Sequence, residues 1–175
     1  MAEIEGSVDS MSAGRSGAAD PAADQWTRLK EADSAEKFAA VWLEIICGSI
    51  NGVRRAVVVL GPRERGPFAP LAIWPVGVAG SRPLAAAAES AIKERSAQVR
   101  ASTDASTDGG SKHDVLAIPV TVDGKVYGSV SIEVAHDPQR DTRALISSLE
   151  WSSTCLEAFV RGHWTPPSDR LVTVL

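Results

Sequence analysis

The sequence has few of the residues that build metal sites or disulfide frameworks. Its 175 residues include two cysteines and three histidines. Neither Cys47 nor Cys155 has a second cysteine or a histidine at the spacing of a metal site. We therefore predict no metal centre and no disulfide. Both cysteines fall in apolar helical patterns, which is typical of buried free thiols in a reducing compartment.

Charge and hydropathy exclude two further classes of protein. The 18 basic and 22 acidic residues give a net charge of −4, so no basic surplus exists to neutralise phosphates, and we expect no nucleic-acid partner. The acidic start MAEIEGSVDS lacks the apolar core of a secretion signal. No apolar run approaches the ~20 residues of a membrane helix. We therefore expect a cytoplasmic protein with no membrane partner within this chain.

The clearest structural pattern is the segment 115–134, VLAIPVTVDGKVYGSVSIEV. Two runs rich in β-branched residues flank Asp123-Gly124, a pair typical of a type I′ hairpin turn. Apolar residues alternate with others in both arms, so one face packs on a core and the other is polar or lines a cavity. Gly128 lets another backbone or a ligand come close. The residues predicted to face the core are Leu116, Ile118, Val120, Val122, Val126, Val130, Ile132 and Val134.

Further elements are predicted on both sides of this hairpin. They are a helix with an Asp33-x-x-Glu36 capping box that ends at Asn51-Gly52, strands at 53–60 and 68–76, a helix from Ser81 to about Arg100 whose apolar stripe is mostly alanine, a flexible loop at 101–114, and a last helix that begins at Asp137-Pro138. An antiparallel sheet with helices on its faces makes an α+β sandwich. We expect this domain at 24–163, between a disordered tail at 1–23 and a linker stub at 164–175.

The hairpin and its neighbours resemble a GAF domain. VLAIPVTVDGKVYGSVSIEV is similar to the core hairpin of that family, and the flanking strands and helices come in the GAF order over Ser34–Arg161. The resemblance implies a GAF-like antiparallel sheet flanked by helices and a regulatory role. GAF domains bind cyclic nucleotides, tetrapyrroles, haem, small metabolites or nothing, and often dimerise through their terminal helices. The segment LEWSSTCLEAFVR also resembles the end of cytoplasmic GAF segments that precede HlyD-like membrane-fusion secretion proteins.

Motifs of several GAF ligand classes are absent from the sequence. It has no Asn-Lys-x(n)-Phe-x3-Asp-Glu pattern of the cyclic-nucleotide class and no cysteine beside a histidine for a bilin. The free methionine sulfoxide reductases have several loop cysteines, whereas Cys47 and Cys155 lie on the predicted outer helices. No Gly-rich phosphate loop or Gly-x-Ser-x-Gly elbow occurs. We therefore predict that the chain is not an enzyme, and the sequence identifies no cofactor.

One hypothesis is a sensory module that binds an unidentified small molecule and signals through helix-mediated dimerisation. The candidate ligand-binding residues are Trp74, His113, Tyr127 and Ser129, with the loop at 101–114 as a lid. The alanine-rich helix lets its neighbour sit close or leaves room for a ligand. A solvated loop histidine and a polar sheet face covered by a helix are the simpler explanations of the same residues.

The alternative hypothesis is a ligand-free interaction or dimerisation module of a larger transport or signalling protein. The last helix has a heptad-like seam, and several tryptophans add apolar surface that one sheet face does not need. A two-fold pairing of like patches buries such surface, so we expect a homodimer. The predicted dimer interface consists of Trp42, Leu149, Trp151 and Leu156.

Overall fold

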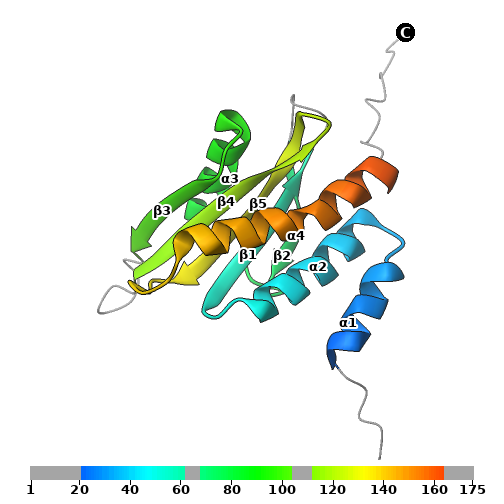
Figure 1. Cartoon of the computed structure of the whole chain (residues 1–175), viewed down its shortest axis with the longest axis horizontal. Helices are drawn as coiled ribbons and strands as arrows, with labels where there is room; N and C mark the ends of the chain where they lie inside the picture. Colours follow the sequence, from blue (N-terminus) through cyan, green and yellow to red (C-terminus); the bar gives the residue numbers. More distant parts are fainter. Residues whose placement is uncertain (1–20, 62–67, 104–111, 164–175) are drawn as a thin grey trace, which may run out of the picture.

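The computed structural model describes residues 21–61, 68–103 and 112–163 (Figure 1). The elements are α1 (Pro21–Lys30), α2 (Ala35–Ser49), β1 (Val53–Leu60), β2 (Ala69–Trp74), α3 (Arg82–Glu94), β3 (Gln98–Thr103), β4 (Lys112–Val122), β5 (Lys125–Ala135) and α4 (Thr142–His163). Helix α1 begins inside the predicted tail. Residues 1–20 and 164–175, predicted as tail and linker, lie outside the described residues.

The strands form one antiparallel sheet in the order β2-β1-β5-β4-β3. This confirms the predicted α+β fold with an antiparallel sheet. The central hairpin is also confirmed, because β4 and β5 pair around a turn at Asp123 and Gly124, which both have a positive φ (49° and 73°). A positive φ at both central residues is what a type I′ turn requires, and its twist matches that of the strands.

Helices cover both faces of the sheet, but unequally. Helices α1, α2 and α4 lie on one face and α3 lies on the other (Figure 1). The larger core lies on the α2–α4 face and includes Trp42, Leu43 and Leu149, all at most 2% exposed. Phe38 and Phe159 stack between α2 and α4, with ring centroids 4.3 Å apart. All the hairpin residues predicted to face the core are buried.

The predicted second helix ends earlier than the sequence indicates. Helix α3 stops at Glu94, and Arg95 caps it in the left-handed region with φ 54°. A non-glycine residue in this position gives little sequence signal, because the left-handed cap is usually glycine. The chain then forms the edge strand β3. The prediction of a helix to about Arg100 is therefore wrong, and the predicted loop at 101–114 is wrong at both of its ends, because β3 extends to Thr103 and β4 begins at Lys112. Residues 104–111 of that loop lie outside the described residues.

Two helix caps also differ from the prediction. Ser34, rather than Asp33, caps α2, and its Oγ accepts a hydrogen bond from the backbone N–H of Lys37 at 3.2 Å. Asp33 forms an ion pair with the Lys37 ammonium at 2.8 Å. Helix α4 is capped by Asp141, whose Oδ1 accepts a hydrogen bond from the backbone N–H of Ala144. Asp137 instead accepts a hydrogen bond from the backbone N–H of Gln139 in a separate turn before the helix. In both places two candidate caps lie close together, and the chain uses the later one.

Gly128 marks the closest approach of β5 to β1. A Cβ atom at this position would overlap the carbonyl oxygen of Val59 and lie 2.8 Å from Leu60 Cδ2. Backbone atoms in a paired strand cannot give way as a flexible side chain can. The glycine predicted to admit a backbone or a ligand therefore admits the β1 backbone.

Gly128→Ala should destabilise the protein, because the added methyl group forces β1 and β5 apart. We expect a loss of about 1–3 kcal/mol in the free energy of unfolding, as for other overpacked sites. Gly48→Ala is the matched control, since nothing lies within 4 Å of a Cβ there, and this helical position should gain up to about 1 kcal/mol. Urea unfolding measures both variants. Equal stability of the two would contradict the close approach.

Candidate functional site

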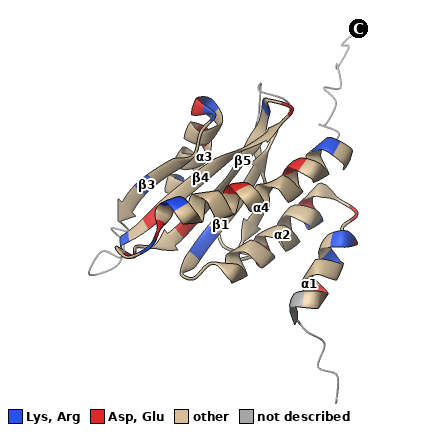
Figure 2. Cartoon of the chain, in the orientation of Figure 1, with Lys and Arg blue, Asp and Glu red and all other residues tan. Residues whose placement is uncertain are grey.

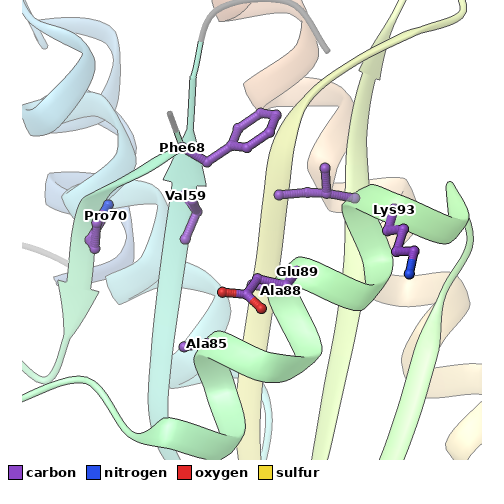
Figure 3. Close-up of a pocket in the computed structure, with 8 residues that line it drawn as sticks. Val59, Phe68, Pro70, Ala85, Ala88, Glu89 and Lys93 are labelled. Carbon is purple, nitrogen blue, oxygen red and sulfur yellow. The ribbon is translucent and has the colours of Figure 1, made fainter. Parts of the chain in front are cut away.

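An apolar groove, here called the α3 groove, lies between α3 and the β1–β2 edge of the sheet (Figure 3). Its volume is about 410 Å³. It shares Val59, Pro70 and Ala85 with an adjoining depression of about 260 Å³ under the start of α3. In Figure 3, α3 places Ala85 and Glu89 on the side that faces Val59 of β1. The groove is thus bounded by one helix and two strands.

The composition of the α3 groove suits a small organic molecule. Its walls come from aliphatic and aromatic side chains, including Val59, Phe68 and Ile92, and it is lined also by the charged Glu89 and Lys93. Ligand sites have volumes of about 300–1,000 Å³, mostly apolar walls and a few polar groups. Alanines on the groove side of α3 leave the space that longer side chains would fill.

A row of buried polar side chains lies behind the groove on β5. Ser129, Ser131 and Glu133 alternate along the strand and share the face that α3 covers, and each is at most 1% exposed. Ser129 pairs with Val59 and Ser131 pairs with Val57 on β1. Within the described chain, neither serine hydroxyl has a hydrogen-bond partner. The two serines are therefore neighbours, across the strand pair, of valines that line the groove or its adjoining depression.

Glu133 links this row to the start of α3. Its Oε2 accepts a hydrogen bond from Ser81 Oγ at 3.2 Å, and Ser81 caps the helix by accepting the amide of Leu84 at 3.3 Å. His113 Nε2 of β4 lies 3.7 Å from Glu133 Oε1. Both members of this pair are 1% exposed. The carboxylate thus lies beside the positive end of the helix dipole, where negative charge is stabilised.

The structure does not bring the four predicted ligand residues together. Trp74 and Tyr127 belong to the core on the α2–α4 face, whereas His113 and Ser129 lie on the α3 face. Tyr127 is the extra residue of a β-bulge, because Gly128 pairs with Val120 and Val126 pairs with Thr121 while Tyr127 has no partner position on β4. A bulge reverses the alternation of side chains, so Tyr127 does not share a face with Ser129 as a strict period of two predicts. The alanine stripe of α3 was the sequence feature that pointed to the groove.

Most of the predicted dimer interface lies inside the core of a single chain. Trp42, Leu149 and Leu156 are 2%, 1% and 1% exposed, and Trp42 Nε1 donates a hydrogen bond to the Ser152 carbonyl at 3.1 Å. The heptad seam of α4 packs against α2 and the sheet, so these three residues are not available to a second copy. Trp151, in contrast, is 80% exposed.

The two cysteines lie on α2 and α4, away from the α3 groove. Burial raises the pKa of the Cys47 thiol to about 12, whereas Cys155 is exposed. Across residues 21–61, 68–103 and 112–163, no group of three His, Cys, Asp or Glu residues is arranged to hold a metal ion. None of the helices described there is long and apolar enough to cross a membrane.

These environments predict different reactivities for the two thiols. At pH 8, Cys155 should react with Ellman's reagent, whereas Cys47 should not, because a thiol with a pKa of about 12 holds almost no thiolate at that pH. Cys155→Ser should therefore remove the fast reaction of the folded protein. In urea the Cys155→Ser variant should regain one reactive thiol. Rapid labelling of this variant before unfolding would contradict the buried position of Cys47.

Solved structures similar to this chain include two GAF domains and the protein fRMsr. No protein-family model matches the sequence, and no curated protein matches it. The structure of fRMsr of Staphylococcus aureus (reduced form) aligns with a TM-score of 0.57 and 14% identity, over 78% of this chain and 90% of the other. The GAF domain of A. aeolicus nlh2 in an inactive state aligns with a TM-score of 0.54 and 13% identity, over 80% and 93%. The GAF domain of an Acinetobacter phosphoenolpyruvate-protein phosphotransferase aligns with a TM-score of 0.53 and 13% identity, over 82% of this chain and 94% of the other.

The chain therefore has the GAF-domain fold, as the hairpin predicted. Identities of 13–14% establish the fold and leave the ligand open. These structures support the GAF resemblance and not the HlyD-like one. Two of the three are described as GAF domains.

Proposed function

We propose that this protein is a cytoplasmic sensory module that binds a small molecule in the α3 groove. The groove itself carries the proposal: a space of about 410 Å³ with apolar walls and two charged side chains. Its described lining includes no cysteine, histidine or serine that could act as a nucleophile beside a base. We therefore propose binding rather than catalysis, although the similar fRMsr structure shows that the fold is not confined to sensor proteins.

We further propose that the module signals as a homodimer through α4. Trp151 lies in a stripe of small, uncharged residues on the side of α4 away from the core: Ala144, Ser148, Cys155, Ala158 and Gly162 are also exposed. Their spacing alternates between four and three residues, which keeps the stripe on one side of the helix. Charged residues on α4 are few and widely separated in Figure 2. A second copy of this stripe is a suitable partner because its small residues allow the helices to approach closely.

A large side chain in the groove should abolish ligand binding without unfolding the protein. Ala85 lines the groove and is exposed, so Ala85→Trp places an indole in the space at little cost to the core. Ala23→Trp on α1 is the matched control. Native mass spectrometry of freshly purified protein should show a bound small molecule in the parent and in Ala23→Trp, and none in Ala85→Trp. If the parent carries no small molecule, the ligand-free interaction module is the better description.

Replacing the exposed tryptophan by an acid should separate the dimer. Trp151→Glu puts a charge at the centre of the proposed interface, where pairing two copies would bring like charges together. We expect the parent to be a dimer at micromolar concentration by light scattering and the variant to be a folded monomer. Glu157→Ala on the same helix should leave the mass unchanged. A monomeric parent would refute the dimer.

A further inference from the structure

We infer that the α3 groove takes a ligand with an apolar body and a polar end that bears N–H groups, and that this end reaches the serines of β5. The inference rests on the proposed function, because it concerns the same groove. It starts from Ser129 and Ser131, which are 0% exposed and whose hydroxyl groups have no hydrogen-bond partner in the described chain. Native proteins bury few such groups, because each loses its hydrogen bonds to water and gains none.

These serines lie directly beside the groove. Ser129 is paired with Val59 and Ser131 with Val57, and both valines line the groove or its adjoining depression. Side chains of paired antiparallel residues leave the same face of the sheet with Cβ atoms about 4.5–5.5 Å apart. The two hydroxyl groups are therefore one side chain away from the groove, under α3, which packs on β4 and β5.

The third polar group of the row determines which chemistry fits. Glu133 Oε1 also has no hydrogen-bond partner in the part of the chain that the structure describes, although His113 Nε2 is 3.7 Å away. Its Oε2 already accepts from Ser81. An ionised carboxylate only accepts hydrogen bonds, whereas a hydroxyl group both donates and accepts. A ligand that satisfies this row must donate, and an amide or amine has the N–H groups to do so.

Helix α3 has to move slightly for the ligand to reach the row, and three of its four buried side chains are alanines. The side-chain hydrogen bonds between α3 or its N-cap and the sheet include those from Ser81 to Glu133 at 3.2 Å, from Gln98 to Glu94 at 3.1 Å and from Arg100 to Ser90 at 2.6 Å. Most of the buried apolar contacts of α3 come from alanines. Alanine buries only a methyl group, so separating it from the sheet costs much less than separating a leucine.

Positive charges near the groove define the competing arrangement. Lys93 lines the groove and Arg82 lines the adjoining depression, so a carboxylate ligand could pair with one of them at the rim. That ligand would leave Ser129, Ser131 and Glu133 Oε1 unsatisfied. An amide end instead pairs with the buried row and brings no negative charge towards Glu133. The two arrangements therefore predict opposite preferences between an amide and the carboxylate of the same shape.

Hexanamide and hexanoate test this preference, because they are isosteric and differ in N–H groups and charge. Titration of the ¹⁵N-labelled protein at pH 7 gives both affinities by NMR. We expect hexanamide to bind at least about tenfold more tightly than hexanoate, as for a ligand that adds hydrogen bonds to a charged acceptor. The amides of Val57, Val59, Ser129 and Ser131 should shift. Equal affinities, tighter binding of hexanoate or no binding of hexanamide would each overturn the inference.

Ser131→Ala should change affinity and stability in opposite directions. Without its hydroxyl the protein should bind hexanamide about fivefold more weakly, yet melt at a higher temperature, because an unpaired buried group is gone. Ser153→Ala is the matched control: Ser153 is 2% exposed on α4, and its hydroxyl donates to the Glu150 carbonyl at 2.8 Å. This control should melt at a lower temperature and keep its affinity. If the Ser131→Ala variant binds hexanamide with unchanged affinity, the buried row is not part of the site and the inference fails. The proposed function would still stand in that case if the co-purified small molecule is present in the parent protein and absent from Ala85→Trp.

Discussion

Strand β5 is buried on both of its faces, and its alternation of side chains decides what each layer of the molecule can do. Val130, Ile132 and Val134 enter the core under α2 and α4, while the residues between them face α3. Both neighbours of β5 in the sheet are long antiparallel strands, so its backbone hydrogen bonds are satisfied on both edges. The absence of a side chain at Gly128 lets β1 lie against it. The strand is therefore held firmly, and the helices on its two faces are free to differ.

The two helical layers differ in what they bury. The α2–α4 face buries large side chains such as Trp42, Leu43 and Leu156 in one continuous cluster. The smaller cluster on the α3 face consists of two valines, one leucine and three alanines. Because the stabilisation from burial scales with apolar area, α3 is the less firmly attached helix. Segments with few buried apolar contacts open at lower free energy than the rest of a protein. The groove therefore lies at the layer that buries less apolar surface.

Most of the fold could be predicted from the sequence where local and tertiary preferences agree. The hairpin turn at Asp123-Gly124 follows from turn chemistry and is confirmed. The core face follows from a period of two and is confirmed for β4 and for Val130, Ile132 and Val134 of β5, whereas Val126, on the other side of the bulge, is buried outside that cluster. The end of α3 and strand β3 were missed because Arg95 adopts a left-handed conformation without glycine. The prediction that Tyr127 shares a face with Ser129 failed for a similar reason, since the bulge depends on how β5 pairs with β4.

The candidate site could be predicted only in part, because its wall is made by residues far apart in the chain. An alanine stripe on α3 indicates space beside a helix, but nothing in the sequence places Val59 and Pro70 opposite that stripe. The heptad seam of α4 shows the converse ambiguity. Leucines at that spacing suit a second helix of another chain or of the same chain equally well. Here α2 and the sheet occupy the seam, which leaves the other side of α4 for a partner.

A path from the groove to α4 follows from the alternation of β5. Ser131 faces the α3 layer, and its two neighbours in the chain, Val130 and Ile132, belong to the same core cluster as Leu149 and Leu156 of α4. A ligand that pulls on the polar row would displace these neighbours with it, because adjacent residues of one strand share a backbone. Close-packed cores resist gradual deformation, so under the proposed function a small displacement of β5 would favour a discrete repacking of the core that it shares with α4, which itself packs mainly on β4. Under the proposed function, the core on the α2–α4 face would transmit the change, and the α3 layer would admit the molecule that causes it.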